Sequence, residues 1–117
     1  KEVRQQNYEL VIQRKIQQYI KNGSKGDLDL SNTPITSLPD NLTNVVGKLY
    51  LHGTQITSLP DNLKVDGNLN LSNTLITNLP KNLKVGGYLD LRDTPISKQY
   101  SARELRTMVP KCYGVYA

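Results

Sequence analysis

One phrase of alternating apolar and polar positions recurs four times along the chain. Each copy opens with glycine and continues L-x-L-x-x-T-x-I, and three copies go on through a Leu-Pro pair, Asn-Leu and valine. The copies begin at Gly26, Gly47, Gly67 and Gly87, at spacings of 21, 20 and 20 residues. The fourth copy keeps only its first half. A period of about 20 residues predicts a stack of similar coils.

The spacing within one copy predicts the course of one coil. The L-x-L alternation is typical of a short strand with both leucines on one face. Proline cannot donate a ladder hydrogen bond, so the Leu-Pro pair is expected on the side away from the sheet. The opening glycine suits a corner with a positive φ. Three valines are expected to occupy equivalent places before the next glycine: Val46, Val65 and Val85.

A single copy is too small to fold alone, because ordering about 20 residues costs more free energy than its few aliphatic side chains gain by burial. Stacked copies share a core and complete one another's parallel hydrogen bonds. The sequence therefore predicts an α/β solenoid with a parallel sheet on one face.

The two ends depart from the repeat and predict caps. In residues 1–25, apolar side chains recur at helical spacing before the helix-stopping pair Asn22-Gly23. These side chains are Tyr8, Val11, Ile12, Ile16, Tyr19 and Ile20. A detachable helix that docks on a partner or membrane is the alternative, and the glutamine-rich polar face argues against a membrane.

The segment 97–117 predicts a C-terminal cap. Ser101 and Glu104 have the spacing of a capping box, and Leu105, Met108 and Val109 give the short helix an apolar face. The stretch 112–116 is expected to form a last parallel strand beside residues 88–92, where it would cover an exposed edge. The chain is thus expected to be one domain, with a cap at 1–25, four repeats at 26–96 (the last partial) and a cap at 97–117.

Residues 26–96 resemble the leucine-rich repeats, and the Leu-Pro turn and short period are similar to those of bacterial and phage members. In place of the family's usual asparagine after L-x-L-x-x stands a threonine in all four copies: Thr33, Thr54, Thr74 and Thr94. The resemblance implies a non-enzymatic module that binds a protein through its concave sheet face. A bacterial or phage adaptor or inhibitor of a host protein is one form that it implies.

The candidate protein-binding residues lie at outward positions of the predicted strands. Strand alternation turns the side chains before, between and after the two leucines toward solvent. Tyrosine and arginine are enriched among residues that dominate binding energy. The candidate site comprises Tyr50, His52, Asn70, Tyr88, Asp90 and Arg92.

Charge leaves a second function open. The net charge is +5, with 15 basic and 10 acidic residues, and the excess of positive charge falls in the two caps. Nucleic-acid binding is the alternative function, and a repeat fragment of a larger bacterial effector is another. The basic residues concerned are Arg14, Lys15, Lys21, Lys25, Arg103, Arg106 and Lys111.

The sequence contains no motif that indicates an enzyme. His52 is the only histidine and Cys112 the only cysteine, and the predicted coils place them three layers apart. No phosphate-binding glycine loop occurs. We therefore expect no catalytic residue, cofactor or metal, and a buried or half-buried thiol at Cys112. The single cysteine favours a reduced cytoplasmic setting, with a secreted effector as the alternative, and no apolar run predicts a membrane span.

Overall fold

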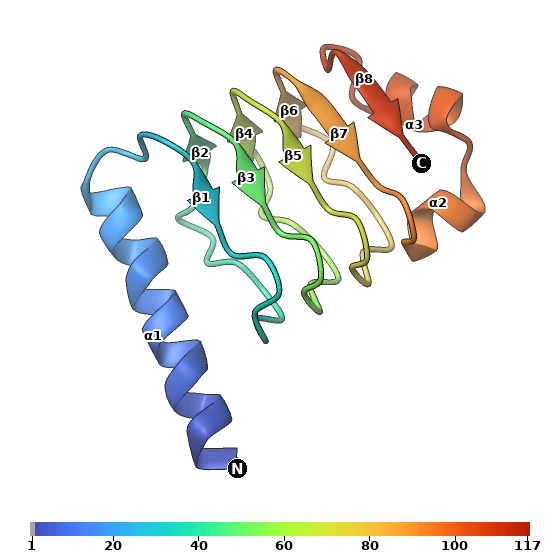
Figure 1. Cartoon of the computed structure of the whole chain (residues 1–117). Coiled ribbons are helices and arrows are strands. Elements are labelled where there is room, and N and C mark those ends of the chain that lie inside the picture. Colours follow the sequence, from blue (N-terminus) through green and yellow to red (C-terminus); the bar gives the residue numbers. More distant parts are fainter. Residues whose placement is uncertain (1) are drawn as a thin grey trace.

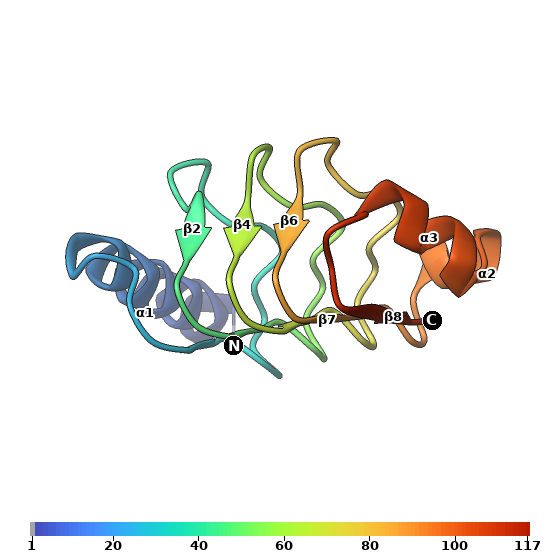
Figure 2. The same ribbon diagram turned by 90° about the horizontal axis from the view of Figure 1, so that it is seen from above.

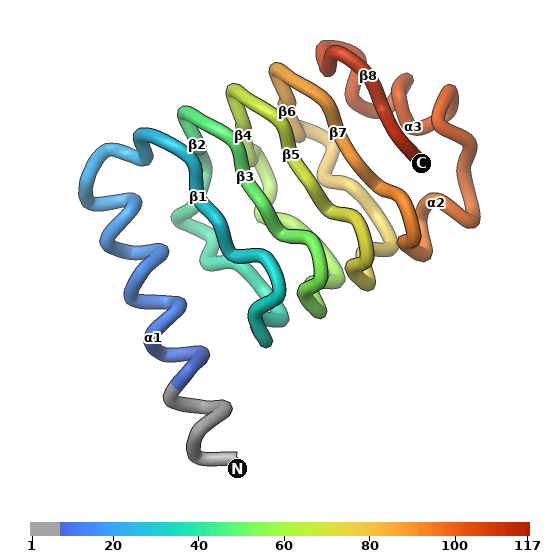
Figure 3. The backbone as a smooth tube through the Cα atoms, in the orientation of Figure 1, coloured from blue at the N-terminus to red at the C-terminus, as the bar shows by residue number. Residues whose placement is uncertain are grey.

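Successive coils of the chain stack side by side, so that strands one coil apart pair in parallel (Figure 1). The computed structural model describes residues 2–117, and their side chains from Tyr8 onward. The chain forms a small β-solenoid with two parallel sheets and a few helices. The smooth trace in Figure 3 shows the coils following one another along the solenoid axis.

The predicted parallel sheet is present and has five strands. Their order is β1-β3-β5-β7-β8, and partners in neighbouring coils are 20 or 21 residues apart, as in Leu28↔Leu49 and Leu49↔Leu69. The strands are β1 (Leu28–Asp29), β3 (Leu49–Tyr50), β5 (Leu69–Asn70), β7 (Tyr88–Asp90) and β8 (Gly114–Tyr116). The last strand, β8, pairs in parallel with β7, as the sequence predicts.

A second parallel sheet, which the sequence did not predict, lies on another side of each coil (Figure 2). It consists of β2 (Asn44–Val45), β4 (Lys64–Val65) and β6 (Lys84–Val85). Each of these strands turns its valine into the core and its other residue to solvent. The expectation for Val46 was wrong: Val45 pairs with Val65, and Val46 is 44% exposed. The cause is one extra residue between Leu42 and Val45, which accounts for the spacing of 21.

The corner glycines are needed for their small size more than for a positive φ, contrary to the prediction. Of the four, only Gly26 has a positive φ, of 84°. A Cβ atom on Gly67 would lie 2.9 Å from the carbonyl oxygen of Gly47, and one on Gly47 would lie 2.6 Å from the carbonyl carbon of Gly26. The coils therefore stack backbone on backbone at this corner, where a side chain does not fit.

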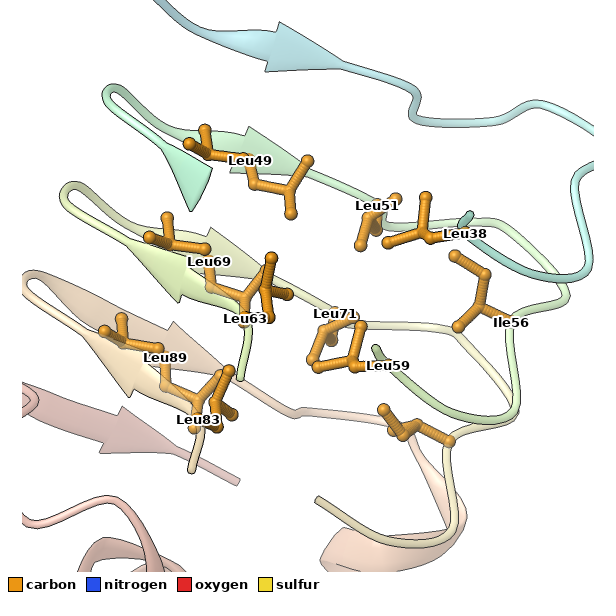
Figure 4. Close-up of a cluster of buried hydrophobic side chains, with 14 of the residues drawn as sticks. Leu38, Leu49, Leu51, Ile56, Leu59, Leu63, Leu69, Leu71, Leu83 and Leu89 are labelled. Atoms are coloured by element: carbon orange, nitrogen blue, oxygen red, sulfur yellow. The ribbon is translucent and has the colours of Figure 1, made fainter. Parts of the chain in front are cut away.

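The core is an aliphatic column that runs through all coils. Figure 4 shows Leu49, Leu69 and Leu89 in successive layers, with Leu63 and Leu83 facing them from the opposite wall. Leu49, Leu51, Leu69 and Leu71 are fully buried, so the predicted register of the strands is confirmed. Burying one such side chain contributes about 1.5–3 kcal/mol.

Helix α1 (Glu2–Lys21) packs on the first coil, although over a narrower stripe than predicted. Ile12 and Ile16 are buried, whereas Tyr8 is 51% and Val11 is 59% exposed. Tyr8 lies one turn before the buried stripe, which begins at Ile12. Val11 is exposed because it points about 100° away from the stripe. The Tyr19 hydroxyl lies 2.8 Å from the carbonyl oxygen of Gly26, next to the helix end.

The C-terminal segment contains two short helices, of which one was predicted. Helix α3 (Ala102–Met108) begins with the expected capping box, in which Ser101 accepts from the Glu104 backbone N–H. Helix α2 (Pro95–Gln99) was missed, although Thr94 caps it and proline occupies its first turn. Leu105 and Val109 are buried, but Met108 is 39% exposed, because α3 turns that side chain outward.

Candidate protein-binding face

The outward side of the five-stranded sheet and the turns that directly follow its strands are named the strand face here. Four of the six predicted site residues lie on the strands, and His52 and Arg92 lie in the turns after β3 and β7. Tyr88 and Arg92 are exposed and the other four are half-buried. Strand pairing sets Tyr50 beside Asn70, Asn70 beside Asp90 and Asp90 beside Tyr116. The structure therefore gathers the predicted residues on one continuous surface.

Short polar side chains are fastened to the backbone of this face. Asp29, Asn70 and Asp90 each accept a hydrogen bond from the backbone N–H two residues later, at 3.0–3.1 Å. Side-chain oxygens in this position form compact local turns. The second coil has Tyr50 in the equivalent place, and its ring instead meets the His52 ring edge-on at a centroid distance of 6.1 Å.

Asp90 and Arg92 form an ion pair at the end of the strand face. The Arg92 Nη2 atom lies 2.7 Å from Asp90 Oδ2, and Nε donates to Asp90 Oδ1 at 3.0 Å. Burial raises the pKa of Asp90, but the hydrogen bonds and charge of Arg92 lower it more, so the net pKa is below its ordinary value. Hydrogen bonds from Ser31 lower the pKa of Asp29. Both carboxylates are thus held in the charged form.

Three tyrosines meet beside this ion pair and form what we name the tyrosine cluster: Tyr88, Tyr113 and Tyr116. The Tyr88 ring meets Tyr113 edge-on at 5.1 Å and stacks on Tyr116 at 5.4 Å. The Arg92 guanidinium lies 5.5 Å from the centre of the Tyr116 ring. The exposed fractions of Tyr88, Tyr113 and Tyr116 are 37%, 70% and 48%. The exposed parts of these three rings form an aromatic surface that is accessible to a partner.

Sequence reasoning missed Tyr113 and Tyr116 as site residues. Both lie outside the repeats, where no alternation marks an outward position. The expected pairing of 112–116 with 88–92 was the available signal, because it places Tyr116 next to Asp90. Gly114 lies under the cluster: a Cβ atom there would be 3.2 Å from the Tyr88 ring. This glycine lets the ring lie flat across β8.

The other polar residues considered for chemistry do not gather into a site, and some of them already have hydrogen-bond partners. Asp27 accepts from the Lys48 backbone N–H at 2.8 Å, so it serves the stacking of coils. His52 Nδ1 is buried and has no hydrogen-bond partner among the residues that the structure describes. Within those residues, no group of three His, Cys, Asp or Glu side chains could hold a metal ion. Cys112 is buried, as predicted.

The basic residues of the two caps are divided between the two ends of the solenoid. Helix α1, with Arg14, Lys15 and Lys21, lies at one end of the solenoid, and α3, with Arg103 and Arg106, lies at the other (Figure 1). The longest dimension of the molecule is 42 Å. Lys15 also donates to the Asp29 carbonyl oxygen at 3.3 Å, which ties it to β1.

The chain matches no protein-family model and no curated protein. No helix within residues 2–117 combines the length and the apolar character needed to cross a bilayer. The geometry of the strand face is therefore the main evidence on function.

Proposed function

We propose that this solenoid is a leucine-rich-repeat protein that acts as a non-enzymatic interaction module and binds a protein partner through the strand face. The tyrosine cluster carries the proposal. Aromatic residues and arginine dominate the energy of protein interfaces, and their clusters bind partners through buried anchor rings. Tyr113 is 70% exposed, so a partner would gain substantial burial there.

The surroundings of the cluster support the same role. Tyrosine offers a large contact area at a small loss of side-chain entropy. The backbone beneath is held by strand pairing on both sides of β7, and Asp90 fixes Arg92. A partner would therefore meet a preorganised surface, which lowers the entropic cost of binding.

The resemblance to bacterial and phage repeat proteins completes the proposal. An adaptor or inhibitor that binds a host protein needs a rigid face and no catalytic group. A reduced cytoplasmic setting suits the free thiol of Cys112, which is 3% exposed and packs in the core.

Quantitative capture from native cell lysate tests the proposal. The bait is the wild-type chain, and the test variant replaces both Tyr113 and Tyr116 with serine. Each anchor contributes about 1–2 kcal/mol, so the double variant should bind its partner at least tenfold more weakly.

The control is Tyr8→Ser, which removes an exposed tyrosine from α1, outside the strand face. It should retain the partner at the wild-type level, and all three baits should melt within a few degrees of one another. If the double variant captures the same proteins in the same amounts as wild type, the strand face is not the binding surface.

A further inference from the structure

The second sheet lies on a different side of the coils from β7 and β8 (Figure 2). A row of lysines crosses this sheet. Lys64 on β4 pairs directly with Lys84 on β6, and both side chains point to solvent. Lys111, from the loop after α3, lines the same shallow cavities as Lys84. We name the continuous surface formed by Lys64, Lys84, Lys111, Asn62 and Asn82 the lysine groove.

The lysines of this groove are poorly compensated. Like charges placed side by side on neighbouring strands repel each other. Lys64 approaches Asp66 only at the limit of an ion pair, 4.0 Å. Among the side chains that the structure describes, from Tyr8 onward, Lys84 and Lys111 form no ion pair. The groove therefore holds positive charge that an anionic ligand would neutralise.

Asparagines line the groove beside the lysines and offer hydrogen bonds. The Asn82 amide nitrogen donates to the Asn62 amide oxygen at 2.9 Å, so that the two side chains are fixed relative to each other. The Asn62 amide nitrogen and the Asn82 amide oxygen remain as a donor and an acceptor. A shallow, open cavity of about 410 Å³ is lined by both asparagines and by Lys64 and Lys84.

We propose that the lysine groove binds an acidic peptide segment in an extended conformation. Extended chains present side chains of one face about 6–7 Å apart, so successive carboxylates can reach successive lysines. The free amide groups of the two asparagines suit peptide N–H and C=O groups. The lining residues of the cavities along the groove include no aromatic side chain, whereas single-stranded nucleic acid is usually held by base stacking.

Fluorescence anisotropy with defined probes tests this site. The probes are a fluorescein-labelled octaglutamate, an octaglutamine of the same length and an oligothymidylate with eight phosphates. The test variant is Lys64→Gln/Lys84→Gln, and the control variant Lys25→Gln/Lys98→Gln has the same net charge with the groove intact. At low salt, octaglutamate should bind the test variant about tenfold more weakly than the wild type. The control should change less than twofold, and octaglutamine should not bind.

Equal loss in the two variants would show attraction by net charge alone and would overturn the proposal, as would absence of octaglutamate binding. Tighter binding of the oligothymidylate, weakened in the test variant, would assign the groove to nucleic acid instead. The Tyr113→Ser/Tyr116→Ser variant should keep its affinity for octaglutamate. This proposal can therefore fail while the strand-face proposal stands, and the reverse.

Discussion

The threonine three residues after the second leucine of each coil is a structural hydrogen-bond donor in the inner coils. The hydroxyls of Thr54, Thr74 and Thr94 donate to the carbonyl oxygen of the leucine three residues earlier, at 2.6–2.7 Å. Thr74 is 2% exposed. From the backbone of residues 2–117 and the side chains described from Tyr8 onward, the Leu71 carbonyl oxygen accepts no other hydrogen bond.

Replacement of Thr74 by valine keeps the shape of the side chain and removes the donor. The Leu71 carbonyl then stays buried without a partner, which costs about 1–3 kcal/mol. Domains of this kind are stable by about 5–15 kcal/mol, so the loss is readily measured. At Thr33 the same bond is only half-buried, and water can replace it, so Thr33→Val should cost less than about 1 kcal/mol.

Urea unfolding followed by far-ultraviolet circular dichroism measures both losses on matched variants. Thr74→Val should lower the free energy of unfolding clearly more than Thr33→Val does. Equal losses at the two sites, or a Thr74→Val protein as stable as wild type, would refute the argument that the buried hydroxyl satisfies a carbonyl which has no other donor.

Two further predictions concern the coil corner and the strand face. Gly67→Ala brings a Cβ atom to within 2.9 Å of the Gly47 carbonyl oxygen, so it should cost about 1–3 kcal/mol of unfolding free energy in urea. A wild-type midpoint would show that the corner can open. The lowered pKa values of Asp29 and Asp90 stabilise the fold above the unfolded value of about 3.9, and this contribution is lost as pH falls through the lower folded values. Asp29→Asn/Asp90→Asn should therefore lose less stability than wild type between pH 5 and pH 2; parallel profiles would contradict this.

The repeat predicted most of the fold because its signal occurs in every coil. The paired leucines gave the register of the five-stranded sheet, and Leu49 and Leu51 are fully buried as a result. The end of α1 and the capping box at Ser101 were predicted from local signals that act within a single turn of chain. The end of α1 and the capping box depend only on residues close in sequence.

Features that depend on neighbouring coils were missed. The second sheet was missed although leucine, lysine and valine alternate at 63–65 and again at 83–85. It forms because the neighbouring coil offers a partner ladder. The corner at Gly67 requires glycine because Gly47 lies against it. The tyrosine cluster unites β7 with a segment outside the repeats, so no periodicity marks Tyr113.

On the strand face, some outward side chains accept hydrogen bonds from the backbone and others do not. At the first outward position, Asp27 and Asn68 accept backbone N–H bonds from the next coil. At the second, Asp29, Asn70 and Asp90 accept them within their own coil.

Tyr88 and Tyr50 stand at these same two positions and have no acceptor oxygen of that kind. The neighbouring coils show that an Asx residue at either position would add a hydrogen bond, so the tyrosines are not what coil stacking demands. Tyr88 packs on Tyr113 and Tyr116 instead, and under the proposed function a bound partner would cover the exposed parts of Tyr50 and Tyr88.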